Sequence, residues 1–165
     1  SHASRLDNEM ATESARRIDL RDLVESFVTA RQATTETHKL RFVAGDNQVP
    51  VMVQDGRIVQ ILDNLLGNAV SFAPAGTSID FAVSLADDGS ACLEVCDQGP
   101  GIPEGRLNAV FNRFYSERPE GEAFGEHSGL GLSIAQQIAQ GYGGDLVASN
   151  RDGACFTLTL PSTEI

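Results

Sequence analysis

Apolar residues recur at helical spacing in three stretches of the chain, and each stretch predicts a helix. The first covers residues 19–30. The second, residues 55–72, is apolar nearly all round, which is typical of a buried helix, and Asp55 is its expected N-cap. The third is expected to begin at Gly129 and to end at the glycine-rich residues 141–144.

Alternating apolar and polar positions predict strands between these helices. The candidates are residues 39–43, 49–53, 79–85, 91–95, 145–149 and 154–160. The third and fourth flank an Asp-Asp-Gly turn, so they are expected to form a hairpin. Strands and helices in this order indicate an α+β fold, in which helices pack on one face of a mixed sheet.

Two segments lie outside these elements. Residues 1–17 are polar and helix-prone, so we interpret them as a linker or as the tail of an upstream helix, and we expect the folded domain to cover residues 18–165. Residues 99–128 are rich in glycine, proline and charge. A segment of that length is too long for a plain connection, and such segments are usually lids or disordered.

A line of polar residues crosses the predicted apolar helix. Gln60, Asn64 and Asn68 recur every four residues and therefore face one direction. A buried amide without a partner costs about 1–3 kcal/mol, so this line must face something polar. A neutral Asn oxygen can be a ligand of Mg²⁺ when phosphates supply the negative charge. Alternatively, the amides bond backbone groups of a neighbouring strand.

An acidic residue and two glycines follow the predicted strand 91–95. Asp97 comes at the end of a strand that should be buried, and Gly99 and Gly101 let a backbone approach a ligand closely. An ionised carboxylate only accepts hydrogen bonds, so Asp97 could accept one from the exocyclic amine of adenine. The alternative is an ordinary Asp-Gly turn. The pattern is neither the dinucleotide fingerprint nor a P-loop.

The charge of the chain limits how it could bind phosphate. The net charge is −11 and Lys39 is the single lysine, so binding to nucleic acid is not expected. Phosphate would have to be held by a metal, by a few arginines and by backbone N–H groups. Gly129 and Gly131 lie at the start of a predicted helix, whose N-terminus can bind an anion without lysine. A glycine-rich hinge is the other interpretation of this block.

The three cysteines do not form a zinc-binding pattern. Cys92 and Cys96 lie four residues apart in a predicted strand and should face the same way. We expect buried, reduced cysteines.

Four blocks together resemble a known family. Residues 64–69, 97–102, 111–115 and 129–132 read Asn-Leu-Leu-Gly-Asn-Ala, Asp-Gln-Gly-Pro-Gly-Ile, Phe-Asn-Arg-Phe-Tyr and Gly-Leu-Gly-Leu. Their order and spacing resemble the N, G1, F and G2 boxes of sensor histidine kinases, and the resemblance extends over about residues 18–161. It implies the Bergerat fold, a two-layer α/β sandwich with a mixed, mostly antiparallel sheet and a long ATP lid over roughly residues 103–128.

The resemblance also implies a Mg-ATP site. Asn68 would be the Mg²⁺ ligand, Asn64 would line the phosphate site, and these two would be the catalytic residues. Asp97 would bind adenine. The other nucleotide-binding residues implied are Phe72, Gly99, Gly101, Ile102, Arg113, His127, Ser128, Gly129, Leu130, Gly131, Leu132 and Thr157.

By the same resemblance, the γ-phosphoryl group of ATP would pass to a histidine on a dimerising helical hairpin. The sequence shows no such hairpin, so we expect a catalytic domain separated from it, monomeric alone and homodimeric in the full-length protein. A response regulator receiver domain is the further partner implied. The parent protein is expected to be an inner-membrane sensor whose catalytic domain lies in the cytoplasm.

Some positions depart from the family pattern. Ser71 stands where many kinases carry Lys or Arg, and Asn112 stands where Glu is frequent. Hydrolysing relatives of this fold have Glu at the position of Asn64, and Asn cannot take a proton from water. The sequence therefore favours transfer to a protein side chain. An ATP-hydrolysing machine, a serine kinase and a nucleotide-binding module without activity are the alternatives.

Overall fold

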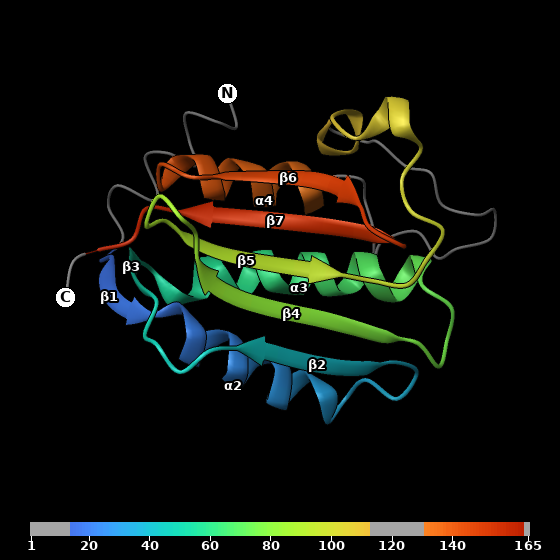
Figure 1. Ribbon diagram of the computed structural model, residues 1–165, viewed down its shortest axis with the longest axis horizontal. Helices are drawn as coiled ribbons and strands as arrows, with labels where there is room; N and C mark the ends of the chain where they lie inside the picture. The colour runs from blue at the N-terminus through green and yellow to red at the C-terminus, as the bar shows by residue number, and fades with distance from the viewer. Residues whose placement is uncertain (1–13, 113–130, 164–165) are drawn as a thin grey trace.

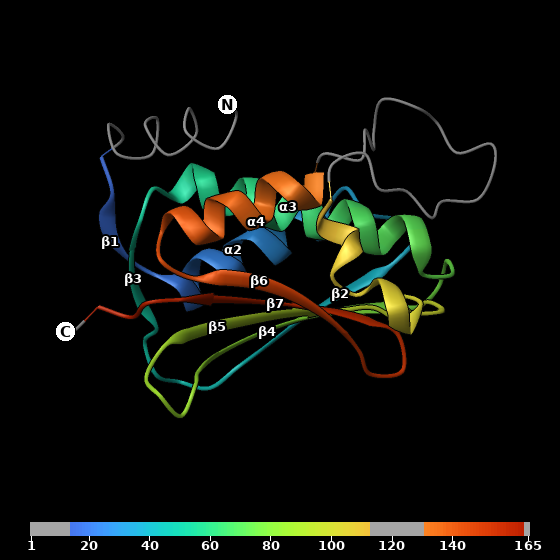
Figure 2. The ribbon, with the colours of Figure 1, turned by 90° about the horizontal axis from the view of Figure 1, so that it is seen from above.

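A five-stranded sheet with helices on one face forms the centre of the protein (Figures 1 and 2). The computed structural model describes residues 14–112 and 131–163. The strand order is β2-β4-β5-β7-β6. These strands are β2 (Lys39–Ala44), β4 (Ser78–Leu85), β5 (Ala91–Cys96), β6 (Asp145–Asn150) and β7 (Ala154–Leu160). The helices are α2 (Leu20–Gln32), α3 (Asp55–Phe72) and α4 (Gly131–Gly141), with short 3₁₀ turns η1 (Glu104–Arg106) and η2 (Ala109–Phe111).

The pairing of the strands confirms a mixed, mostly antiparallel sheet. β2 runs parallel to β4, and every other pairing in this sheet is antiparallel. The β4–β5 and β6–β7 pairs are the hairpins of adjacent strands along the chain. In the view from above, α2, α3 and α4 lie together on one side of this sheet (Figure 2). The α+β, two-layer sandwich predicted from the sequence is therefore confirmed.

A second, two-stranded sheet lies at one end of the molecule, beside the start of α3 (Figure 1). It pairs β1 (Arg16–Asp19) with β3 (Pro50–Val53) in antiparallel register. Neighbouring strand candidates 39–43 and 49–53 thus enter different sheets. Strand β1 also includes Arg16 and Arg17, which the sequence pattern assigned to the polar N-terminal segment.

The N-termini of α2 and α3 are capped by side chains. Asp19 caps α2 by accepting a hydrogen bond from the backbone N–H of Arg21 at 3.0 Å. The prediction of Asp55 as the N-cap of α3 is wrong, since Asp55 is already the first helical residue. Gln54 caps the helix instead, and its Oε1 accepts from the N–H of Arg57 at 2.9 Å. The longer Gln side chain reaches the same N3 position that Asp would reach.

The core lies between the helices and one face of the five-stranded sheet. On β5 the buried residues Ala91, Leu93 and Val95 alternate with partly exposed ones. The buried residues of α3 that meet this face are Ile58, Ile61, Leu62, Leu65, Leu66 and Ala69. Among the described helices, none is both long and apolar enough to cross a membrane.

The cysteines correct one expectation. Cys92 and Cys96 do face the same way, on the sheet face opposite the helices, but both are only half-buried. Cys96 lies directly opposite Cys155 in the β5–β7 register, with Cα atoms 4.1 Å apart, and the two form a disulfide. Cys155 is thus buried but not reduced, and Cys92 is the free cysteine.

Candidate functional site

Asp97 is the buried acidic residue at the end of β5. Its side chain continues the core-facing alternation of Leu93 and Val95, so it points toward the helices, and the residue is only 5% exposed. Oδ1 accepts hydrogen bonds from the backbone N–H of Gly99 at 2.8 Å and of Ala154 at 3.3 Å. Both hydrogen bonds from described residues end on Oδ1. Oδ2 is therefore the oxygen free to accept from a ligand.

Burial raises the pKa of the Asp97 carboxyl above its ordinary value. The backbone hydrogen bonds from Gly99 and Ala154 and the charge of nearby His38 oppose this rise. Burying a carboxylate without hydrogen-bond partners costs free energy. The two backbone donors offset part of this cost, and a donor group of a ligand would offset more. The arrangement suits an acceptor that meets a donor group of a ligand.

The glycine loop after Asp97 packs against the end of α3. A Cβ added at Gly99 would lie 3.0 Å from the carbonyl oxygen of Phe72, so glycine allows this close approach. Gly101 has φ +81°, a conformation that other residues rarely adopt. Phe72 is half-buried at the C-terminus of α3. The structure thus brings together Asp97, both loop glycines and the end of the helix that carries the asparagines.

The two asparagines of α3 are half-buried. Nδ2 of Asn64 donates to the carbonyl oxygen of Gly131 at 3.1 Å, which joins α3 to the first residue of α4. A Cβ at Gly131 would lie 3.2 Å from Asn64 Oδ1, so the glycine keeps this contact short. No described residue forms a hydrogen bond with the amide of Asn68. The alternative in which the polar line bonds backbone groups therefore applies to Asn64. Its partner is a carbonyl at the start of a helix rather than in a strand.

The site residues are spread along α3 in a definite order. Given a rise of 1.5 Å per residue, Asn68 lies about 6 Å and Asn64 about 12 Å along the axis from Phe72. Phe72 is adjacent to the Asp97 loop, and Asn64 is adjacent to the start of α4. A ligand bound at Asp97 and extended along α3 would therefore meet Asn68 first and then Asn64. Gln60, one turn further, is exposed.

The structure does not bring Thr157 to this site, which corrects the prediction. Thr157 alternates with the buried Phe156 and Leu158 of β7, so its side chain lies on the sheet face opposite the helices. There it lies opposite Glu94 and its hydroxyl donates to Glu94 Oε2 at 3.4 Å. Asp97 points to the other face. Counting the alternation from the apolar Phe156 gives this result from sequence alone.

The remaining predicted residues divide between the described chain and the rest. Ile102 is half-buried and packs against the core, as does Leu132 near the start of α4. Arg113, His127, Ser128, Gly129 and Leu130 lie outside the described residues. Phe111, the first residue of the third block, is buried and meets the ring of Phe156 edge-on at 6.0 Å. This contact attaches the start of the predicted lid to the sheet.

Three residues near Asp97 were missed by the sequence prediction. His38 is 5% exposed, and its Nε2 donates to the carbonyl oxygen of Ala73 just after α3. Asn150 bonds the backbone of Ile102 through both atoms of its amide. Ala154 donates its N–H to Asp97. None has a sequence signal, because each is defined by a contact between segments far apart in the chain.

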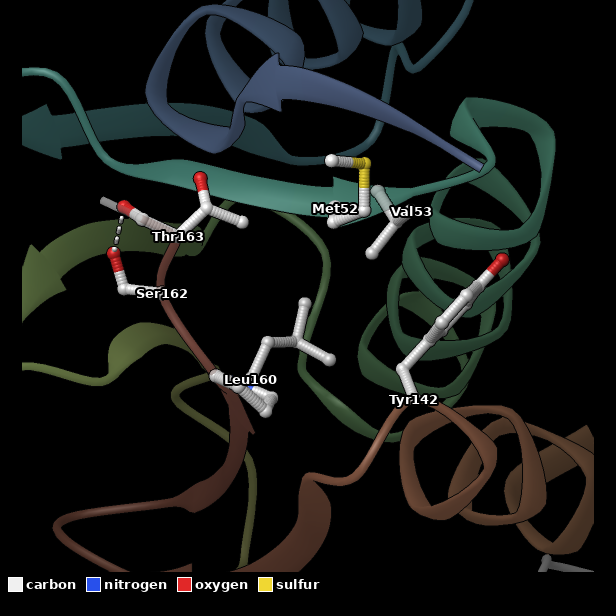
Figure 3. Close-up of a pocket in the computed structure, with 7 residues that line it drawn as sticks. Met52, Val53, Tyr142, Leu160, Ser162 and Thr163 are labelled. Carbon is white, nitrogen blue, oxygen red and sulfur yellow. Dashed lines mark hydrogen bonds between the residues drawn. The ribbon is translucent and has the colours of Figure 1, made fainter. Parts of the chain in front are cut away.

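A pocket of about 130 Å³ lies at the other end of α3 (Figure 3). It is lined by Met52, Val53, Tyr142, Leu160, Pro161, Ser162 and Thr163. The Tyr142 hydroxyl accepts from the N–H of Gln54, the N-cap of α3, whereas Asp97 adjoins the C-terminal end. The pocket has no acidic or basic side chain, so the candidate site remains the one around Asp97.

The donor set at Asn68 suits Mg²⁺ only together with an anionic ligand. Among the described residues, no group of three or more His, Cys, Asp or Glu side chains could hold a metal ion. Asn68 offers one neutral oxygen, which is a hard ligand of the kind that Mg²⁺ takes. The charge to balance the metal would come from phosphates. The residues present therefore fit a metal that arrives with a nucleotide.

Comparison with known proteins agrees with this geometry. Residues 53–164 match the family described as histidine kinase-, DNA gyrase B-, and HSP90-like ATPase. Sensor protein ChvG of Rhizobium meliloti strain 1021 is 41% identical across 98% of this chain, and the chain spans 31% of that protein's length.

Solved structures share the fold. The catalytic domain of histidine kinase ThkA, in a nucleotide-free form, has a TM-score of 0.78 and 24% identity, over 92% of this chain and 97% of that one. Full-length ShkA in complex with AMPPNP has a TM-score of 0.80 and 24% identity, over 99% of this chain and 34% of that one. This chain belongs to the family of histidine kinase-, DNA gyrase B- and HSP90-like ATPases.

Proposed function

We propose that this chain binds ATP with Mg²⁺ and, as part of a longer sensor histidine kinase, transfers the γ-phosphoryl group to a histidine of a dimerisation domain. The observation that carries the proposal is the Asp97 carboxylate. It is buried, its Oδ1 is held by two backbone N–H groups, and Oδ2 is left to accept from a ligand. The exocyclic amine of adenine is a donor, whereas guanine has a carbonyl at that position.

The phosphate end of the site supports the same assignment. Asn68 and Asn64 lie along α3 beyond the base position, and Asn64 adjoins the first residue of α4. A helix N-terminus attracts phosphate through its backbone N–H groups. Bound Mg²⁺ would neutralise part of the phosphate charge during phosphoryl transfer. The chain's own part is to fix the base at Asp97 and to align the phosphates along α3.

Asn64 supports transfer to a protein acceptor over hydrolysis. Its Nδ2 is engaged by the carbonyl of Gly131, and an amide cannot act as a general base for water. Asn64 therefore cannot activate a bound water for attack on the phosphate. The acceptor histidine, the dimerisation domain that carries it and a response regulator receiver domain are partners proposed from the family. The parent is proposed to be a homodimeric membrane sensor with this domain in the cytoplasm.

Calorimetric titration of the chain with ATP and GTP, each with and without Mg²⁺, tests the binding step. We expect selective binding of ATP that is strengthened by Mg²⁺. Absence of binding at millimolar ATP would contradict the proposal. The transfer step is tested by adding the histidine-bearing hairpin of the parent protein and following phosphate from γ-labelled ATP. Release of inorganic phosphate without labelled hairpin would identify the chain as a hydrolase instead.

A further inference from the structure

Asn150 and Ile102 form a reciprocal pair of hydrogen bonds. Asn150 Oδ1 accepts from the N–H of Ile102 at 2.8 Å, and its Nδ2 donates to the carbonyl oxygen of Ile102 at 2.7 Å. The two residues are 48 positions apart in the chain. Asn150 is the last residue of β6, and Ile102 follows the second glycine of the loop after Asp97. One side chain therefore satisfies both backbone groups of one loop residue.

This pairing depends on the chemistry of an amide. Asn presents a donor and an acceptor side by side, which matches the N–H and C=O of a single residue. Asp would keep the acceptor but would place a second oxygen against the carbonyl of Ile102. Ala would leave both backbone groups to water. The side chain is also close to Gly101, where a Cβ would lie 2.8 Å from Asn150 Oδ1.

The pair fixes the far end of a loop whose near end is fixed by Asp97. Gly99 is held by its N–H bond to Asp97 Oδ1, and Ile102 is held by Asn150. Residues 99–103 have no helix or strand of their own. Glycine gives such a segment many conformations, so ordering it on binding would cost conformational entropy. Anchors at both ends remove part of that cost before a ligand arrives.

The β6–β7 hairpin contains the far anchor, Asn150, and also contacts the near anchor, Asp97. Asn150 pairs with Ala154 in the register of that hairpin, and Ala154 donates its N–H to Asp97 Oδ1. The turn between Asn150 and Ala154 packs closely against the end of β5. A Cβ added at Gly153, in this turn, would lie only 2.0 Å from the carbonyl oxygen of Asp97. The guanidinium of Arg151 pairs with Glu94 on β5. The hairpin is thereby fixed relative to the base-recognising carboxylate.

We propose that Asn150 is a positioning residue for nucleotide binding, which holds the Gly99–Pro103 loop in its binding conformation through the backbone of Ile102. The inference rests on the proposed function, since it concerns how the ATP site is preorganised. Asn150 acts through the loop and at the base end of the site. Loss of its side chain should therefore weaken the binding of ATP and of ADP by the same factor. The factor by which Mg²⁺ strengthens nucleotide binding should stay unchanged.

The test compares Asn150→Ala with the wild-type chain by calorimetry, using ATP and ADP with and without Mg²⁺. We expect both nucleotides to bind about tenfold more weakly, which corresponds to loss of one to two net hydrogen bonds. Amide hydrogen exchange by NMR should show that the Ile102 N–H loses protection in the variant. Asn150→Asp keeps the acceptor for that N–H, so protection should persist while affinity still falls. It also serves if Asn150→Ala does not fold.

Ser162→Ala is the matched control. Ser162 Oγ donates to the carbonyl of Pro50 at 3.0 Å, so this variant also loses a partly buried hydrogen bond, but at the opposite end of β7. It should lower stability without changing affinity. Folded Asn150 variants with wild-type affinity for both nucleotides would overturn the positioning role while the proposed function stood. A wild-type chain that binds no ATP would overturn the proposed function and this role with it.

Discussion

The amide of Asn64 donates a hydrogen bond to the carbonyl oxygen of Gly131, 3.1 Å away. It links the middle of α3 to the first residue of α4, so two blocks that are 67 residues apart in sequence meet in one place. Glycine suits this contact, since a Cβ at position 131 would lie 3.2 Å from Asn64 Oδ1, which is tighter than an ordinary contact. The phosphate end of the proposed site is thus defined by a direct contact between the first and the last of the four blocks.

Replacing Asn68 by Ala should remove the dependence of ATP affinity on Mg²⁺. The amide oxygen is the proposed metal ligand, and no described residue forms a hydrogen bond with it, so unfolding free energy should change by less than about 0.5 kcal/mol. Calorimetry with and without Mg²⁺, beside urea unfolding, measures both. Gln60→Ala removes an exposed amide two turns earlier on the same line and should change neither. An Asn68→Ala chain whose ATP affinity still rises with Mg²⁺ would refute the ligand assignment.

Asp97→Asn should change the base preference. Asn can still accept from Gly99 and Ala154 through Oδ1, but it would present a donor to the ligand in place of Oδ2. Two donors would then face each other with adenine, so ATP affinity should fall about 10- to 100-fold. The affinity for GTP, whose guanine has a carbonyl at that position, should fall less or should rise. Competition between ATP and GTP for the variant measures the change, and an unaltered ATP preference would exclude Asp97 from base recognition.

The same substitution has a defined effect on stability. The folded-state pKa of Asp97 is raised by burial, so ionisation is harder in the folded than in the unfolded chain. The stability contributed by the protonated carboxyl is complete below the unfolded pKa and is lost as pH rises through the folded pKa. At neutral pH the neutral Asn side chain should therefore be tolerated in the folded state. Its advantage over Asp in unfolding free energy should shrink in acid, where Asp97 is also neutral. Urea unfolding at several pH values checks this sign.

Local sequence patterns predict most of the elements but not how segments pair. The helical spacing around Asn64 and Asn68 gives α3, and the alternation around the turn at 87–89 gives the β4–β5 hairpin. These features depend on neighbours within one element. The pairing of β1 with β3 depends on residues some 35 positions away, which periodicity does not report. Arg16 and Arg17 carry no apolar pattern that would mark a strand.

Within the site, the sequence predicts the residues of the motifs and misses those that support them. Asp97 and Asn64 stand in recognisable blocks, whereas Asn150 and His38 are ordinary polar residues until the fold places them beside Ile102 and Ala73. Thr157 is a different case, because its own strand alternation already places it on the face away from the helices. At this position the family motif and the strand alternation predict different faces, and the structure agrees with the alternation.

The cysteine pairing can be tested by counting thiols. Cys96 and Cys155 form a disulfide, and Cys92 is free. Thiol titration of the denatured chain, prepared without reductant, should therefore find one thiol per chain and three after reduction. Reduction should also lower the unfolding free energy by about 2–4 kcal/mol, since the bond closes a long loop in the unfolded chain. The unfolding free energy of the Cys155→Ser chain should hardly change on reduction. Three thiols in the unreduced wild-type chain would contradict the pairing.

His38 should stabilise the end of α3. Because the carbonyl of Ala73 can only accept, Nε2 donates to it, and Nδ1 is hydrogen-bonded with the hydroxyl of Thr37 at 2.8 Å. His38→Phe removes both interactions and leaves a buried carbonyl without its donor, so the unfolding free energy should fall by about 1–3 kcal/mol. Thr37→Val removes only the hydroxyl bond and should cost less. Denaturant unfolding of both variants measures the difference, and a His38→Phe chain as stable as wild type would show that the Ala73 carbonyl finds another partner.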